Sequence, residues 1–158
     1  MKMQTYIGTK IIEAVPAIRK GGNVYELTQP IPKSMDPEEE GYKVRYQDGY
    51  ESFSPKAVFE EAYRPIDGMN FGLAIEAAKQ GKKITRRGWN GKGMWVIYRS
   101  GYPDGIPCNK NTADAVGIPE GTLLKVRPYL QMKCADDTYQ MWLASQSDIL
   151  AKDWEIVE

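Results

Sequence analysis

Residues 83 to 99 read Lys83-Ile84-Thr85-Arg86-Arg87-Gly88-Trp89-Asn90-Gly91-Lys92-Gly93-Met94-Trp95-Val96-Ile97-Tyr98-Arg99. β-Branched and aromatic residues gather towards both ends of this stretch, and glycines punctuate its middle. The pattern predicts two strands, 83–86 and 94–99, joined by a tight turn over 89–93. Because Arg86 and Arg87 are adjacent in a strand, their side chains are expected to point to opposite faces.

The sequence before this stretch predicts one main helix. Asn70 can cap it, apolar residues recur at helical spacing through Phe71 and Ala78, and Gly81 can end it. After the stretch, residues 100–127 are rich in Gly, Pro and Asn and are expected to form a long loop.

The last thirty residues predict the rest of a sheet. Two alternating segments, 129–133 and 139–142, flank Asp136-Asp137 and predict a hairpin. A short helical turn over 147–151 and a closing strand over 154–157 complete the unit.

The first sixty-six residues differ in composition from the rest, because they contain tyrosines and no tryptophan. A strand is expected over 6–15, with Pro16 near its end, and a loop over 30–40 that includes a solvated acidic run. An Asp-Gly hairpin turn lies near residue 48, and Ser54 is expected to cap a short helix. The predicted fold class is α+β, a small antiparallel sheet with one main helix, preceded by a small β-rich module. The expected domains are 1–66 and 67–158.

Composition excludes several classes of function. The chain of 158 residues has 21 basic and 21 acidic residues, so a long nucleic-acid track is not expected. No apolar run approaches a membrane span, and no apolar signal core follows the N-terminus, so we expect a cytosolic protein. Histidine is absent, and Cys108 and Cys134 fit neither a zinc site nor a disulfide scaffold. No catalytic residue, metal or cofactor is expected, although Asp, Glu, Lys or Tyr can still support catalysis.

All four tryptophans lie in the second unit, beside Arg, Asn and Gln. A buried indole needs a partner for its N–H, so this pattern favours either rings stacked on a flat, nucleotide-like ligand or a core near turns. Trp89 and Trp142 are the candidates for stacking, whereas Trp95 and Trp154 are expected in the core. One of the two arginines could bind a phosphate, or both could form a plain surface pair. Asp148 is expected to cap its helical turn.

The second unit resembles a small phage-encoded family over Met69 to Val157. The shared motifs are Met69-Asn70-Phe71, Gly81-Lys82-Lys83, Arg86 to Met94, Tyr129 to Lys133, Trp142 to Leu150 and Asp153 to Val157. The family resembled is the second group of Thoeris anti-defence proteins. This resemblance implies a non-catalytic sponge that sequesters a cyclic ADP-ribose isomer, glycocyclic ADP-ribose, and in some members cyclic dinucleotides. It also implies a homotetramer with ligand sites shared between protomers, acting in the host bacterial cytoplasm without a nucleic-acid polymer or a membrane.

The resemblance also implies a set of ligand-binding residues. Phe71 and Trp89 would frame the adenine or ribose, and Arg86, Asn90 and Lys92 would lie near phosphates or sugar edges. A second group would complete the wall of the site and bind ribose hydroxyls. The full set is Phe71, Arg86, Trp89, Asn90, Lys92, Met94, Trp142, Ala144, Ser145, Gln146 and Asp148.

Two alternatives to the sponge remain open. One is an enzyme that degrades such signals with Asp or Glu as a base, and the other is a structural or regulatory phage subunit whose Trp motifs build a core or an oligomer interface. For the sponge, Trp89→Ala is expected to lose ligand while the protein stays folded. For the structural subunit, the same change is expected to destabilise the fold.

Overall fold

The computed structural model describes residues 3–158 of the chain. The chain divides into two compact units, the first ending at Pro65 and the second comprising Ile66–Glu158. Within residues 3–158, no helix is both long enough and apolar enough to cross a bilayer.

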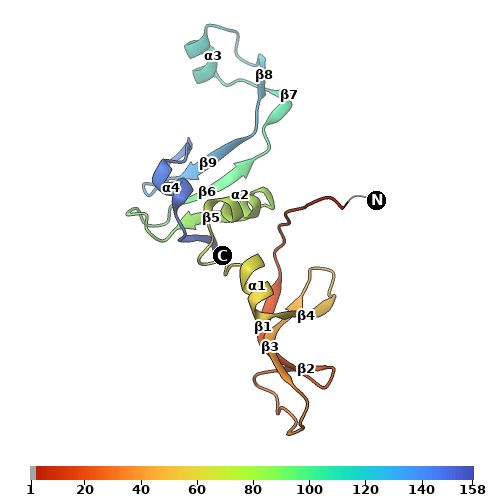
Figure 1. Ribbon diagram of the computed structural model, residues 1–158. Coiled ribbons are helices and arrows are strands. Elements are labelled where there is room, and N and C mark those ends of the chain that lie inside the picture. Colours follow the sequence, from red (N-terminus) through yellow and green to blue (C-terminus); the bar gives the residue numbers. More distant parts are fainter. Residues whose placement is uncertain (1–2) are drawn as a thin grey trace. The chain divides into compact units, whose positions relative to one another are not determined.

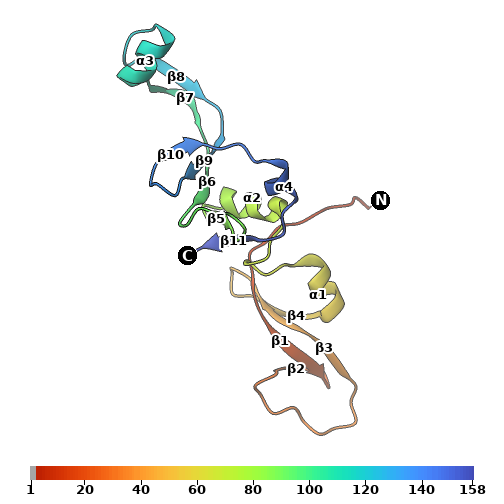
Figure 2. The ribbon, with the colours of Figure 1, turned by 90° about the vertical axis from the view of Figure 1, so that its left-hand side faces the viewer.

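The second unit is built on a five-stranded antiparallel sheet with the strand order β10-β9-β6-β5-β11 (Figure 1 and Figure 2). Its strands are β5 (Lys83–Arg86), β6 (Trp95–Arg99), β9 (Tyr129–Lys133), β10 (Tyr139–Met141) and β11 (Trp154–Val157). The predicted hairpin is confirmed, because Tyr139 pairs with Lys133 and Met141 with Gln131. The closing strand lies beside β5 and pairs Trp154 with Arg86. The predicted α+β class is therefore confirmed.

The main helix, α2 (Phe71–Lys79), packs on one face of this sheet. Asn70 caps it as predicted, since the Asn70 side chain accepts a hydrogen bond of 2.9 Å from the Leu73 amide. Small residues let the helix approach the strands closely. The buried core comprises Met69, Ala74, Ala77, Ala78, Ile84, Val96, Met132 and Trp154.

The opposite face of the sheet carries Trp95, which corrects the prediction that this residue belongs to the core. Val96 points into the core, so its neighbour Trp95 points to the other face. There the Trp95 ring meets Tyr139 edge-on at 5.9 Å between ring centroids, and the Lys83 ammonium lies 5.4 Å from the Trp95 centroid. Alternation along the strand decides the face, whereas apolarity alone suggested burial.

Residues 100–127 form an ordered arm rather than an irregular loop. The two-stranded sheet of β7 (Tyr102–Pro107) and β8 (Leu123–Val126) carries α3 (Lys110–Val116), and the arm extends from the ends of β6 and β9 (Figure 2). At its base Gly101 adopts φ +77°, and a Cβ there would lie 2.4 Å from the Val126 carbonyl oxygen. The chain therefore bends at a position that accepts only glycine.

The first unit is a four-stranded antiparallel sheet with the order β2-β1-β3-β4 and one helix. Its elements are β1 (Glu13–Lys20), β2 (Asn23–Glu26), β3 (Glu38–Arg45), β4 (Glu51–Pro55) and α1 (Lys56–Ala62). The hairpin over 42–54 is confirmed. The helix begins after Pro55, and Ser54 does not cap it.

Two expectations for this unit were wrong. The first strand begins at Glu13 rather than Tyr6, and it contains Pro16. Pro16 is tolerated because β2 pairs with β1 only from Ala17 onwards, so β1 has one neighbour at residue 16. The acidic run ends in β3 instead of a loop, because Glu38 pairs with Lys20 at 2.8 Å and Glu39 with Arg19 at 2.5 Å.

Candidate functional site

Four aromatic rings from four segments of the second unit form one cluster. Trp154, which is 0% exposed, lies at its centre. The ring centroids of Phe71, Trp89 and Trp142 lie 5.5, 5.4 and 6.0 Å from the Trp154 centroid, in tilted or edge-on orientations. These orientations place positive ring edges against negative ring faces, which stabilises aromatic pairs. Trp154 is in the core as predicted, and the three outer rings are partly buried against that core.

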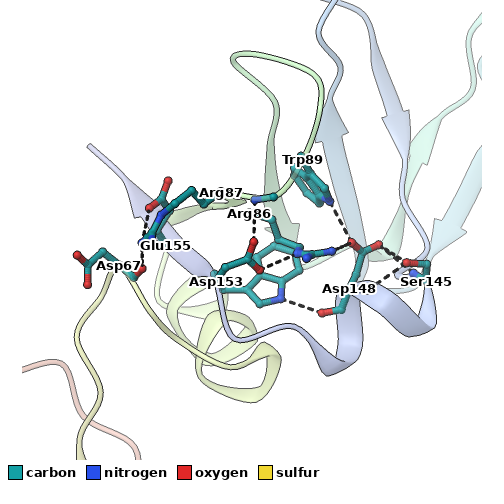
Figure 3. A network of polar contacts seen from close by, with 10 residues as sticks. Asp67, Arg86, Arg87, Trp89, Ser145, Asp148, Asp153 and Glu155 are labelled. Atoms are coloured by element: carbon teal, nitrogen blue, oxygen red, sulfur yellow. Dashed lines mark hydrogen bonds and ion pairs between the residues drawn. The ribbon is translucent and has the colours of Figure 1, made fainter.

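The Asp148 carboxylate connects the turn after β5 to α4 (Gln146–Leu150) (Figure 3). Its Oδ1 accepts hydrogen bonds from Arg86 Nη1 at 2.9 Å and Trp89 Nε1 at 3.0 Å. Its Oδ2 accepts from the amide and the hydroxyl of Ser145, at 3.0 and 2.8 Å. Four donors therefore occupy one carboxylate that is only 7% exposed as a residue.

The prediction that Asp148 caps its helical turn is confirmed in the form of a capping box. The Ser145 hydroxyl accepts from the Asp148 amide at 3.1 Å, while the Asp148 carboxylate accepts from the Ser145 amide. The Asp148 carbonyl oxygen also accepts from Trp154 Nε1 at 2.9 Å. The start of α4 is thus fixed both to itself and to the central tryptophan.

Arg86 is shared between two carboxylates. Its Nε donates to Asp153 Oδ1 at 2.9 Å, in addition to the bond from Nη1 to Asp148. Arg87 points away and is 62% exposed, as the strand alternation predicted. The Arg86 side chain is therefore the inward member of the pair, and it is held by protein carboxylates on two of its nitrogens.

The electrostatics of these carboxylates follow from their donors. Burial alone would raise the pKa of Asp148, but hydrogen bonds from Trp89, Arg86 and Ser145 outweigh it and lower that pKa to about 2. The hydrogen bond from Arg86, supported by the Gly88 amide, lowers the pKa of Asp153 despite partial burial. Both side chains are therefore anionic at neutral pH.

The structure brings most of the predicted ligand-binding residues into one region of the second unit. Arg86, Trp89, Ser145 and Asp148 form a single polar network, and Phe71 and Trp142 lie in the aromatic cluster around it. Met94 and Ala144 are half-buried. The exposed members are Asn90, Lys92, Ser145 and Gln146, and of these Ser145 is already bonded to Asp148. The side chains that are free to contact a ligand are thus fewer than the motif suggested.

Gly88 and Asp153 belong to this network but were not predicted as site residues. Asp153 accepts from Arg86 and from the Gly88 amide, the latter at 2.7 Å. Both residues lie inside quoted motifs, but their contact joins positions 65 residues apart, and no local pattern predicts such a pairing. The nearest signal was the position of Asp153 directly before Trp154 in the last shared motif.

Comparison with known proteins agrees with the resemblance carried by these motifs. The family model described as the Thoeris anti-defense 2-like domain matches residues 69–157. A protein of Bacillus phage SP01 named Thoeris anti-defense 2 is 36% identical over 89 residues, which are 56% of this chain and 94% of that relative. The matched residues contain the whole aromatic cluster and polar network described above. The chain therefore belongs to the Thoeris anti-defense 2-like family, and its second unit is the family domain.

Proposed function

We propose that this protein counteracts Thoeris defence by binding and sequestering a cyclic nucleotide signal without degrading it. Glycocyclic ADP-ribose is the primary ligand in this proposal, and cyclic dinucleotides are a second class to be tested. The protein acts in the cytoplasm of the host bacterium. Membership of the family supports the anti-defence role, and the residues around the Trp89 turn support the ligand class.

One observation carries the proposal at the level of the site. The hydrogen bond from Trp89 Nε1 to Asp148 Oδ1, at 3.0 Å, joins two motifs that are 59 residues apart. It ties the turn that carries the exposed Asn90 and Lys92 to the start of α4, where Gln146 is exposed. A lysine ammonium can neutralise a phosphate. The side-chain amides of Asn90 and Gln146 can donate hydrogen bonds to ribose hydroxyls and base edges and accept from them.

Tight binding requires stacking and charge-assisted hydrogen bonds to act together. A sponge needs roughly nanomolar affinity, which is about −12 kcal/mol. Each aromatic ring stacked on a base contributes roughly 1–3 kcal/mol, and each charge-assisted hydrogen bond about 1.5–3 kcal/mol. Association costs several kcal/mol, so a site held rigid before binding is an advantage. The network around Asp148 supplies that rigidity.

A degradative enzyme is disfavoured by the state of Asp148. A general base at neutral pH needs a pKa near 7 and a free lone pair. Asp148 has a pKa of about 2, and four protein donors occupy its oxygens. The Asp153 carboxylate has a lowered pKa as well and is engaged by Arg86 and the Gly88 amide.

The protein acts as a homotetramer in this proposal, with ligand sites shared between protomers. A run of exposed apolar side chains around β10 and α4 supports self-association: Tyr139 is 56% exposed, Met141 69%, Leu143 91% and Leu150 73%. Large exposed apolar patches often mark protein–protein interfaces. Light scattering of the purified protein measures the mass directly.

A second candidate function is a structural or regulatory phage subunit. The observation that favours it is that Trp89 and Trp142 pack against the core, and that Arg86, Ser145 and Asp148 satisfy one another. In this role the tryptophan motifs build the fold and bind nothing.

The experiment that separates the two functions changes only exposed residues. Wild type, Asn90→Ala, Lys92→Ala and Gln146→Ala are titrated calorimetrically with glycocyclic ADP-ribose and, in parallel, with a cyclic dinucleotide. Lys125→Ala in β8 is the matched control for the loss of an exposed lysine. The sponge predicts nanomolar binding by wild type and control, and at least tenfold weaker binding by Lys92→Ala. No binding of either nucleotide by wild type contradicts it. Trp89→Ala does not separate the functions, because Trp89 also contacts the core.

A further inference from the structure

Asp153 holds three consecutive residues at the start of the turn that carries Trp89. Its Oδ1 accepts from Arg86 Nε at 2.9 Å and its Oδ2 from the Gly88 amide at 2.7 Å. Its backbone carbonyl oxygen accepts from the Arg87 amide at 3.2 Å. Figure 3 shows the Asp153 carboxylate joined to the Arg86 guanidinium, with the Arg87 side chain pointing the other way. One residue next to β11 therefore fixes the direction in which the turn leaves β5.

A side chain at position 88 would push the Asp153 carboxylate out of its present position. A Cβ at position 88 would lie 2.7 Å from Asp153 Oδ2 and 3.3 Å from Arg86 Nη2. Because both of these atoms belong to side chains, a methyl group at position 88 would displace the carboxylate rather than the backbone. The absence of a side chain at Gly88 therefore leaves room for the Asp153 carboxylate to accept from the Gly88 amide.

Beyond Gly88, the turn is held mainly at its two ends. Trp89 Nε1 is bonded to Asp148 on one side, and the Met94 carbonyl oxygen accepts from the Thr85 hydroxyl at 2.7 Å on the other. Between these anchors, Asn90 and Lys92 are exposed, and within residues 3–158 their side chains take no part in the hydrogen bonds and ion pairs that hold the turn. Their position thus depends on the anchors.

We propose that Asp153 is a positioning residue for ligand binding by the turn: it contacts no ligand, and it pre-orders Asn90 and Lys92 through Gly88 and Arg86. This inference rests on the proposed function, since it assigns the turn to the ligand site. Ordering the turn before binding removes a conformational entropy cost that binding would otherwise have to meet.

The carboxylate is required because each of its oxygens accepts from a different donor. An asparagine offers one acceptor oxygen and one NH₂ group, so in Asp153→Asn one of the two donors faces another donor. Asp153→Asn is therefore nearly isosteric but loses one of the two hydrogen bonds, either from Arg86 or from the Gly88 amide. Gly88→Ala breaks the same contact from the other side, because the new methyl group displaces the carboxylate.

The test uses the full chain and two readouts. Affinity for glycocyclic ADP-ribose is measured by calorimetry, and amide hydrogen exchange is measured over residues 88–92 without ligand. The variants are Asp153→Asn and Gly88→Ala. The controls are Asp136→Asn, which removes an exposed carboxylate from the β9–β10 hairpin, and Ile84→Val, a core change that lowers the melting temperature without touching the turn.

Asp153→Asn and Gly88→Ala are expected to speed exchange over 88–92 at least tenfold and to weaken binding at least tenfold. Both controls are expected to keep affinity and exchange within about twofold of wild type. Wild-type affinity in Asp153→Asn overturns the inference, and so does an equal loss of affinity in Ile84→Val, which would reflect general destabilisation. If Asp153→Asn does not fold, Gly88→Ala decides by the same criteria.

The two readouts separate failure of this inference from failure of the proposed function. If wild type binds neither glycocyclic ADP-ribose nor a cyclic dinucleotide, the proposed function fails and the exchange rates alone decide the role of Asp153. Faster exchange confined to 88–92 then supports Asp153 as the residue that orders the turn. Unchanged exchange overturns it.

Discussion

Asp148 shows how one side chain can hold together parts of a chain that are distant in sequence. Its two oxygens accept from Arg86 and Trp89 of one motif and from Ser145 of the other. A buried carboxylate is costly unless its charge is paired and its lone pairs are used, and here both conditions are met. The same contacts give the residue a pH-dependent contribution to stability.

Asp148→Asn is expected to lower stability most at neutral pH. The pKa of Asp148 falls from its usual 3.8 to about 2 on folding, so its contribution is present above about pH 4 and is lost as the pH falls towards 2. The shift corresponds to about 2 kcal/mol. Urea unfolding at pH 7, 4 and 2.5 measures the difference between wild type and variant, with the exposed Asp114→Asn as a control. A difference that is constant across this range would contradict the role assigned to Asp148.

Trp89 is expected to contribute to stability through both its ring and its N–H. Trp89→Phe keeps an aromatic ring against Trp142 and Trp154 but removes the bond to Asp148, which should cost about 1.5–3 kcal/mol. Trp89→Ala removes the ring as well and should cost about 3–5 kcal/mol. Chemical denaturation measures both values. Equal stability of Trp89→Ala and wild type would show that the ring is not structural.

At the scale of elements, local signals in the sequence predicted most of the second unit. Asn70 as the cap of α2, the hairpin after residue 129 and the closing strand at Trp154 all follow from patterns within a few residues. Errors arose where a partner strand decided the outcome. The first strand starts at Glu13 because β3 pairs there, and Glu38 is in a strand because Lys20 lies opposite.

Asn70→Ala is expected to cost about 0.5–2 kcal/mol of global stability, because α2 covers the core of the sheet. Asn109→Ala removes an equivalent cap from α3, where Asn109 accepts from the Thr112 amide at 2.9 Å. That helix belongs to the arm, so this variant should loosen α3 and leave global unfolding within about 0.5 kcal/mol of wild type. Thermal melting and local hydrogen exchange measure the two effects. Equal losses of global stability would mean that the arm and the sheet unfold together.

At the scale of the whole molecule, the sequence identified the segments of the site but not their contacts. Its motifs contain Arg86, Trp89, Asp148 and Asp153, yet the bonds from Arg86 and Trp89 to the two carboxylates span 59 to 67 residues. Sequence order also could not distinguish side chains bonded to each other from side chains left exposed. That distinction separates Arg86, which is held by two carboxylates, from Lys92, which is exposed.

The second unit is expected to fold without the first. All residues of its core lie between Met69 and Trp154, inside the compact unit Ile66–Glu158. A fragment of residues 66–158 should therefore melt cooperatively and bind glycocyclic ADP-ribose within about threefold of the full chain. Circular dichroism and calorimetry check these outcomes. A fragment that does not melt cooperatively would show that the first unit is needed for folding.

The central claim is that the protein holds a nucleotide signal and leaves it chemically intact, and mass spectrometry of the released ligand tests this most directly. The protein is saturated with glycocyclic ADP-ribose, separated from free ligand, incubated and then denatured by heat. We predict that stoichiometric ligand of unchanged mass is recovered, because the carboxylates of the site are engaged and weakly basic. Recovery of a hydrolysed product, or of no ligand, would contradict the account.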